Sequence, residues 1–221
     1  MELRYIAIEG VIGVGKTELA KILAQRLNAE CVLEEVEENP FLANFYKDMR
    51  GYSFQTQIFF LLSRHKQQQH LLQRNLFIDR IVSDYLFEKD RIFAYLNLTE
   101  HELVLYEKLY QFLAKDVRKP DLVVYLQARL ETVLERIRKR GRPFEREISV
   151  EYLEALTDSY NRFFLHYDTT PVLIVNTENL DFVNNQQDFE NLYQAIITTP
   201  GGRIFYSPKG EKRRRKASRI T

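Results

Sequence analysis

Short apolar runs alternate along this chain with longer stretches in which apolar residues recur every three or four positions. The short runs predict five β-strands, at Arg4–Glu9, Glu30–Leu33, Asn75–Asp79, Asp121–Leu126 and Pro171–Asn176. The longer stretches predict helices at Lys16–Leu27, Tyr52–Leu72, Thr99–Lys115, Leu130–Arg140, Ser149–Tyr167 and Asn184–Ile197. Strands that alternate with helices indicate an α/β fold, a parallel sheet with helices on both faces.

The pattern changes near the end of the chain. A Pro-Gly-Gly break follows Thr199, and the basic run Lys212–Lys216 comes after it. A run of like charges is usually solvated and disordered, although it can also serve as a patch for an anionic partner or as a targeting signal. We therefore expect one domain over residues 1–198 and a basic, disordered tail over residues 199–221.

Composition excludes several classes of protein. The formal net charge is +1, so nucleic-acid binding is not expected despite the basic tail. No apolar run approaches the roughly 20 residues that cross a bilayer, and the N-terminus has no signal-peptide pattern. The single cysteine cannot form an internal disulfide, which fits a reducing compartment. We expect a cytoplasmic protein with no membrane partner.

The segment Gly10–Thr17, called the phosphate loop below, matches the template G-x-x-x-x-G-K-[ST] at every fixed position. It lies between a predicted strand and a predicted helix, where successive backbone N–H groups point at a polyphosphate. The alternative is a glycine turn before an ordinary helix. The positions expected to bind ATP are Gly10, Gly13, Gly15, Lys16 and Thr17. Lys16 would reach the β- and γ-phosphates, and the Thr17 hydroxyl would hold Mg²⁺.

Charged residues follow the next two predicted strands. Ligands of parallel sheets lie at the carboxyl ends of the strands, so these residues are expected beside the phosphate loop. The acidic segment Glu34–Glu38 is either a solvated loop or the source of a carboxylate that takes a proton from a substrate hydroxyl. Asp79 is expected on the Mg²⁺ side of the site, and Arg80 is expected to bind a phosphate oxygen.

A third group of charges ends the predicted helix Leu130–Arg140. Arg136 and Arg140 lie one turn apart on the same face, and Gly141 follows them. They form either a basic, solvated helix end or a lid that neutralises charge on a transferred phosphoryl group.

These separate motifs resemble those of the deoxynucleoside kinase family, in its bacterial deoxyadenosine/deoxyguanosine kinase branch. The resemblance runs from about Tyr5 to Phe182. It implies a P-loop kinase fold with a five-stranded parallel sheet and an arginine-rich lid, and it makes residues 1–198 the kinase domain. It also implies ATP-dependent phosphorylation of the 5′-hydroxyl of a deoxynucleoside, with Mg²⁺ as cofactor, by a homodimer.

The resemblance also implies roles for single residues. Glu34 matches the general base, although Glu35 stands where the family usually has proline, so either glutamate could act. Arg80, Arg136 and Arg140 match catalytic arginines. The residues matched to the acceptor and donor are Tyr46 and Glu145 for the sugar 3′-hydroxyl, Gln57 and Arg64 for the base, Asp84 as the acid paired with Arg64, Arg142 in the lid, and Asp181 beside the adenine of ATP.

Two other functions remain open from the residues. A nucleoside monophosphate kinase shares the fold, but the acidic segment Glu34–Glu38 would repel a phosphate on the acceptor. A regulatory module could bind ATP without transferring phosphate, but it would not need a base and a lid. Within the deoxynucleoside kinase interpretation, a buried arginine–aspartate pair favours purine deoxynucleosides, with deoxyadenosine first, deoxycytidine second and thymidine poor.

Overall fold

A computed structural model describes residues 3–74 and 79–208 of the chain. Its centre is a six-stranded sheet in the order β2-β3-β1-β4-β5-β6, and all neighbouring strands are parallel. The strands are β1 (Tyr5–Gly10), β2 (Glu30–Val32), β3 (Ile81–Ser83), β4 (Leu122–Gln127), β5 (Val172–Asn176) and β6 (Arg203–Tyr206). The predicted parallel α/β fold is confirmed, with one more strand than expected.

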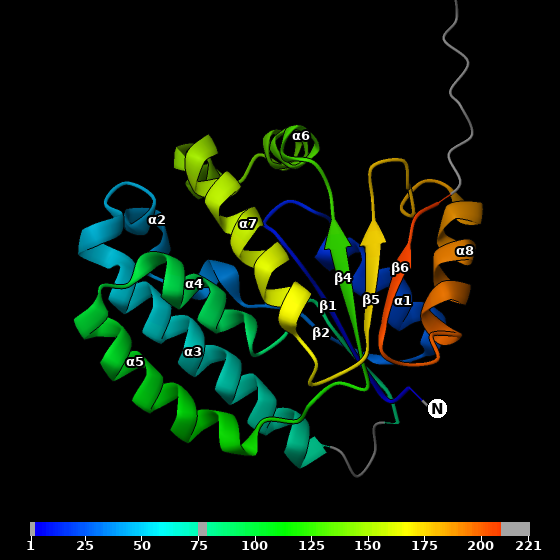
Figure 1. Cartoon of the computed structure of the whole chain (residues 1–221), viewed down its shortest axis with the longest axis horizontal. Coiled ribbons are helices and arrows are strands. Elements are labelled where there is room, and N and C mark those ends of the chain that lie inside the picture. Colours follow the sequence, from blue (N-terminus) through cyan, green and yellow to red (C-terminus); the bar gives the residue numbers. More distant parts are fainter. Residues whose placement is uncertain (1–2, 75–78, 209–221) are drawn as a thin grey trace, which may run out of the picture.

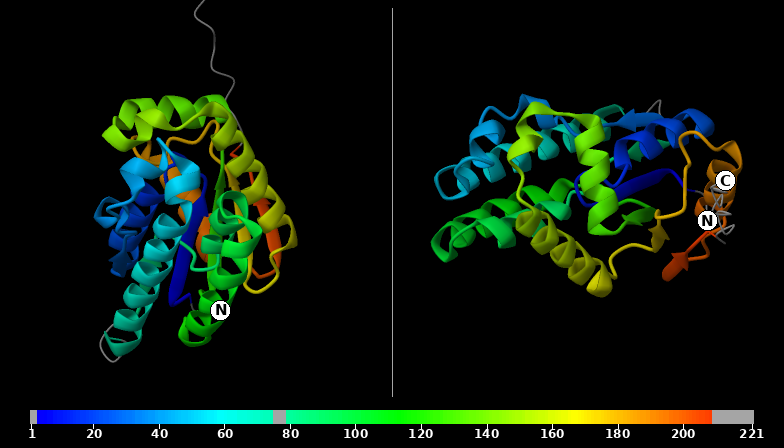
Figure 2. Two further views of the ribbon diagram at one scale, coloured as in Figure 1. Left: turned by 90° about the vertical axis from the view of Figure 1, so that its left-hand side faces the viewer. Right: turned by 90° about the horizontal axis from the view of Figure 1, so that it is seen from above.

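Helices cover the sheet on both faces and extend to one side of it (Figure 1). They are α1 (Lys16–Leu27), α2 (Leu42–Phe45), α3 (Met49–Arg74), α4 (Lys89–Asn97), α5 (Glu100–Leu113), α6 (Leu130–Arg140), α7 (Val150–His166) and α8 (Gln186–Ile197). Helix α3 packs against α4 and α5 at that side, as Figures 1 and 2 show. None of the helices among the described residues is both long and apolar enough to cross a bilayer.

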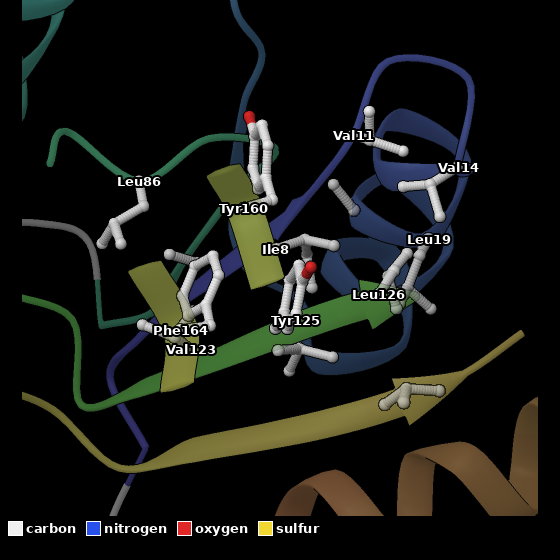
Figure 3. Packing of buried hydrophobic residues seen from close by; sticks show 14 of the residues in the cluster. Ile8, Val11, Val14, Leu19, Leu86, Val123, Tyr125, Leu126, Tyr160 and Phe164 are labelled. Atoms are coloured by element: carbon white, nitrogen blue, oxygen red, sulfur yellow. The ribbon is translucent and has the colours of Figure 1, made fainter. Parts of the chain in front are cut away.

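The buried core lies between α1, the sheet and α7. On the α7 side, the ring of Phe164 stacks on Tyr125 of β4 with 4.1 Å between ring centroids, and Tyr160 lies next to them (Figure 3). On the other side, Leu19 of α1 packs near Leu126, the residue that follows Tyr125 (Figure 3). Successive residues of a strand face opposite sides, so the wholly apolar interior of β4 is explained by burial on both faces.

The third strand differs from the sequence prediction. Most of the expected strand Asn75–Asp79 lies outside the described residues, because residues 75–78 are not described, and the third strand that the structure shows is Ile81–Ser83. Ile81 and Val82 are β-branched and almost completely buried, which suits an inner strand beside β1. The shift matters for the site, because Asp79 now precedes the strand and Asp84 follows it.

The end of the domain also differs. Arg203–Tyr206 lies within the expected tail, but it forms β6 and pairs in parallel with β5. Its side chains alternate between exposed and half-buried, as expected for an edge strand with one face on a helix layer. The domain therefore reaches past residue 198, while the basic run Lys212–Lys216 lies outside the described residues.

Candidate active site

The phosphate loop connects the carboxyl end of β1 to the first turn of α1. Gly13 and Gly15 have φ angles of 83° and 110°, which side chains other than glycine rarely adopt. The ammonium of Lys16 donates to the carbonyl oxygens of Gly10 and Val11 at 2.7 and 3.2 Å. The five positions predicted to bind ATP therefore lie in one loop, and the side chain of Lys16 folds back over that loop.

A second ammonium group faces this loop. Burial and, to a lesser extent, the nearby charge of Lys89 lower the pKa of Lys16 to about 8. Lys89 begins α4 and is only 2% exposed. Two buried cations repel each other unless anions lie between them, so the site favours a polyanion such as a triphosphate.

The carboxylate beside Thr17 belongs to Asp84, directly after β3. Thr17 Oγ1 donates to Asp84 Oδ2 at 2.6 Å, and the backbone N–H of Glu34 donates to Asp84 Oδ1 at 2.7 Å. Asp84 therefore does not form the expected pair with Arg64. A hydroxyl and a carboxylate oxygen at the phosphate loop are the kind of protein ligands that Mg²⁺ takes.

The expectation that Asp79 and Arg80 lie beside the phosphate loop was wrong. Both residues precede β3, and the carbonyl oxygen of Arg80 accepts a hydrogen bond of 2.9 Å from the N–H of Glu30, where β2 begins. They therefore lie at the amino edge of the parallel sheet. The phosphate loop lies at the carboxyl edge, roughly 20 Å away along a six-residue strand such as β1.

Glu34 follows β2 and is held by two cations. Its Oε1 accepts from Nε and Nη2 of Arg64 at 2.7 and 2.5 Å, and its Oε2 accepts from the ammonium of Lys89 at 2.7 Å. Burial disfavours the ionised form, but the charges of Arg64 and Lys89 outweigh burial and hold the pKa of Glu34 well below its usual range. The exposed Glu35 instead accepts from Ser63 at 3.2 Å, so Glu34 is the glutamate that faces the site.

Gln57 and Arg64 share a partner, Asp90, on the first turn of α4. Arg64 donates from Nη1 to Asp90 Oδ2, and the amide of Gln57 donates to Asp90 Oδ1 at 2.5 Å. The Tyr106 hydroxyl, from α5, donates to the same oxygen at 2.7 Å. Gln57 and Arg64 thus share one face of α3, and both bind the fully buried carboxylate of Asp90.

Sequence reasoning missed Lys89 and Asp90 because it did not predict α4. A signal was present: Ile92 and Ala94 are buried on this helix, and Glu88 to Asp90 place charges before an apolar pair, Ile92-Phe93. The position of Asp84 beside the phosphate loop could also have been predicted, because it is the first carboxylate after the β-branched pair Ile81-Val82.

The lid, which we define as residues 136–145, contains four of the predicted side chains, those of Arg136, Arg140, Arg142 and Glu145. Arg136 donates to the carbonyl oxygens of Val14 and Thr177 at 2.8 and 3.2 Å, so it ties α6 to the phosphate loop. Arg140 forms a two-bond pair with the buried Glu145, with distances of 3.1 and 2.5 Å. Arg136 thus contacts the phosphate loop, whereas Nε and Nη2 of Arg140 are bound within the lid.

Tyr46 lies in the same region as the lid. Burial raises the pKa of Tyr46 well above its ordinary value, and the nearby Tyr152 and Glu145 raise it further. Tyr46 therefore stays protonated and can donate its hydroxyl, and Glu145 lies within electrostatic reach of it. Arg142 connects the lid to the acidic segment through Glu37, at 3.5 Å.

Asp181 lies in the loop after β5. Its carboxylate accepts from the N–H of Asn184 at 3.0 Å and stabilises a turn. The next residue, Phe182, packs against the phosphate loop, since a Cβ on Gly15 would lie 3.2 Å from its ring. The loop is therefore placed beside the nucleotide-binding end of the sheet.

The buried carboxylate of Glu9 connects three parts of the site. Glu9, the last residue before the phosphate loop, accepts from the N–H of Gly10 at 2.9 Å and from the N–H of Leu86 at 2.8 Å. The hydroxyl of Tyr160 on α7 donates to it at 3.2 Å. Glu9 thus holds the phosphate loop, the segment between β3 and α4, and α7 together.

The chain matches known proteins along nearly its whole length. A family model described as deoxynucleoside kinase matches residues 6–199. A deoxyguanosine kinase of Bacillus subtilis is 40% identical over 196 residues, which cover 85% of this chain and 93% of the relative. A deoxyadenosine kinase of Dictyostelium discoideum is 38% identical over 193 residues, covering 85% of this chain and 77% of the relative.

Solved structures agree with the sequence matches. The structure of deoxyadenosine kinase from M. mycoides with bound dATP superposes with a TM-score of 0.74 and 29% identity. The superposition covers 88% of this chain and all of the other. Sequence and fold therefore agree, and the chain is a phosphotransferase that belongs to the deoxynucleoside kinase family.

Proposed function

We propose that this enzyme transfers the γ-phosphoryl group of ATP to the 5′-hydroxyl of a purine deoxynucleoside, with deoxyadenosine preferred. One observation carries the proposal: the buried carboxylate of Glu34 lies between Lys89, which faces the phosphate loop, and Arg64, which faces Asp90. A proton acceptor is thus positioned between a triphosphate site and a base site. The named relatives, which include deoxyguanosine and deoxyadenosine kinases, support this choice.

Glu34 takes the proton of the 5′-hydroxyl as that oxygen attacks the γ-phosphorus. Phosphoryl transfer leaves little covalent work to the protein, so positioning and charge neutralisation supply most of the acceleration. Lys16 and Lys89 bind the phosphates from two sides. Arg140 joins them when it leaves Glu145, and Arg136 keeps α6 against the phosphate loop.

Lys89 takes the role that the resemblance gave to Arg80. It is a buried cation that contacts Glu34, as Arg64 does, and unlike Arg64 it lies close enough to Lys16 for its charge to lower the pKa of Lys16. An ammonium on a flexible stem can follow the phosphoryl group as it moves from the donor to the acceptor.

Mg²⁺ would be held by Thr17 and Asp84 in place of the expected Thr17 and Asp79. No group of three or more His, Cys, Asp or Glu side chains among the described residues forms a metal site by itself. The two protein oxygens fit an ion that keeps several waters and takes its other ligands from substrate phosphates. Such an ion supplies positive charge at the phosphate oxygens.

The substrates are expected to contact further residues of the site. Tyr46 and Glu145 would hold the sugar 3′-hydroxyl, and the loop at Asp181 would lie against the adenine of ATP. The Arg64–Asp90 pair presents N–H donors beside a carboxylate acceptor, which suits adenine. Thymine offers a carbonyl and a methyl group at that edge, and leaving a buried polar group unpaired costs roughly 1–3 kcal/mol.

We further propose a homodimer formed through the outer faces of α3 and α5. Four large apolar side chains are at least half exposed there, namely Leu62, Val104, Leu105 and Phe112. Exposed apolar patches on helices often mark protein interfaces. Light scattering of the wild type and of Phe112→Ser tests this: the variant should be a monomer, and a monomeric wild type would contradict the proposal. A cytoplasmic location suits an enzyme that consumes ATP.

A phosphoryl-transfer assay tests the main proposal. ATP and Mg²⁺ are combined with each of the four deoxynucleosides and with dAMP and dTMP, and the product is identified. We expect deoxyadenosine and deoxyguanosine to have the highest kcat/KM, deoxycytidine to follow and thymidine to be poor. Transfer to a monophosphate alone would indicate a nucleoside monophosphate kinase, and ATP binding without transfer would indicate a regulatory module.

A further inference from the structure

One guanidinium group joins the two functional carboxylates of the acceptor side. Arg64 is 4% exposed and uses Nε and Nη2 for Glu34 and Nη1 for Asp90. The Phe60 ring lies 4.9 Å from its guanidinium carbon and limits the directions in which it can move. The side chain that faces the base therefore also holds the general base.

The contact with Glu34 occupies the oxygen that a substrate needs. A carboxylate oxygen has about two acceptor positions, and Arg64 fills two on Oε1 at 2.7 and 2.5 Å. Lys89 holds the other oxygen, Oε2, at 2.7 Å. A 5′-hydroxyl can reach Oε1 only when Arg64 withdraws, and Asp90 offers the guanidinium a second anion towards which it can move.

We infer that Arg64 couples base recognition to the general base: a base that draws the guanidinium towards Gln57 and Asp90 releases Oε1 of Glu34 for the 5′-hydroxyl. This inference rests on the proposed function. Arg64 is thereby a positioning residue for Glu34 in addition to its contact with the base. The identity of the base then affects the chemical step as well as the affinity.

Coupling of this kind is reciprocal. If a bound base weakens the hold of Arg64 on Glu34, then weakening that hold by a substitution at Glu34 raises the affinity for that base. Glu34 lies at the sugar end of the acceptor, so a purely local role would not let it discriminate between bases. Base discrimination is therefore a readout that a merely structural role of Glu34 would leave unchanged.

The test measures binding by calorimetry in the full chain without ATP. The dissociation constants of deoxyadenosine and thymidine are measured in wild type, Glu34→Gln, Arg64→Met and the double variant. Glutamine holds a guanidinium less strongly than glutamate, because the ionic component is lost. In Glu34→Gln we expect the preference for deoxyadenosine over thymidine to rise by about fivefold or more, the lower end of typical coupling.

In the Arg64→Met background, adding Glu34→Gln should change the ratio by less than about twofold, since the cycle isolates the pair. Glu145→Gln is the matched control: it removes another carboxylate paired with an arginine, and it should weaken both nucleosides equally. If Arg64→Met does not fold, Arg64→Lys replaces it, because one ammonium cannot bridge both carboxylates.

An unchanged ratio in Glu34→Gln overturns the inference, and so does an equal change when Arg64 is absent. Those results would leave the proposed function intact. Failure of the wild type to bind any deoxynucleoside would instead overturn the proposed function, and the inference with it.

Discussion

The donor side and the acceptor side of this site are built in different ways. The donor side is one continuous segment, Gly10–Thr17, whose backbone conformation is set by its own glycines. The acceptor side is assembled from Glu34 after β2, Arg64 on α3 and the pair Lys89-Asp90 on α4. A backbone motif can be recognised from spacing alone, whereas an assembly of side chains depends on where every strand ends.

The strongest test of the acceptor side is Glu34→Gln. The amide keeps the size of the side chain but cannot take a proton, and general bases contribute about 10²–10⁴-fold. We expect kcat to fall by at least about 100-fold while deoxynucleoside binding persists. Glu35→Gln is the matched control, and it should change kcat by less than about threefold because that side chain faces solvent. Equal losses in the two variants would contradict the assignment.

Lys89 and Arg80 form a second matched pair. Lys89→Met removes the cation beside Glu34 and should lower kcat by about 100-fold, as for other donors to developing charge. Arg80→Met removes a cation at the opposite edge of the sheet and should leave kcat within about twofold, in line with surface substitutions. Steady-state kinetics of both variants, with Lys89→Arg as a partial rescue, decide between them. A larger loss in Arg80→Met would restore the original assignment.

The lid gives an intermediate effect, because Arg140 reaches the phosphates only when it leaves Glu145. Arg140→Ala should lower kcat by about tenfold or more while the affinity for ATP changes little, since its contact strengthens in the transition state. Arg138→Ala, an exposed neighbour on α6, controls for loss of charge. Parallel losses of kcat and of ATP affinity would show uniform binding instead.

The smallest effect is expected at the C-terminus. Deleting residues 209–221 removes the basic run but leaves β6 in place, so Tm and kcat should stay within experimental error. Deleting residues 199–221 removes β6 as well, exposes the edge of β5 and should lower Tm by several degrees. Thermal unfolding of both truncations measures the difference. Equal Tm values would show that β6 adds nothing to stability.

Much of the fold was predictable because alternating strands and helices leave a strong pattern. Helix α6 has the predicted bounds, Leu130–Arg140, and α5 begins at Glu100, one residue after the predicted start at Thr99, whose side chain caps it. The position of the third strand was not predictable, because two short apolar runs lie next to each other and the strand itself, Ile81–Ser83, has only three residues. Pattern alone does not distinguish such short runs.

The errors in the site follow from that strand. The expected strand end placed Asp79 beside the phosphate loop, whereas the carboxylate that Thr17 contacts is Asp84, which the resemblance had paired with Arg64. Lys89 and Asp90 were missed because they are charged residues on the buried face of α4, so they interrupt the apolar pattern that predicts a helix. Glu34, Gln57 and Arg64 lie close together in the structure, and each depends on a strand end or a helix that was predicted.

The buried carboxylate of Glu9 has a consequence for motion. It binds the N–H groups of Gly10 and Leu86 and the hydroxyl of Tyr160. One side chain therefore holds the start of the phosphate loop, the segment between β3 and α4, and α7 in fixed relative positions. Separating them would strand a charge in the protein interior, which is costly. Closure of the site by bending the sheet is therefore disfavoured. The movement that admits and encloses two substrates is left to the lid and the acidic segment, which meet where Arg142 lies 3.5 Å from Glu37.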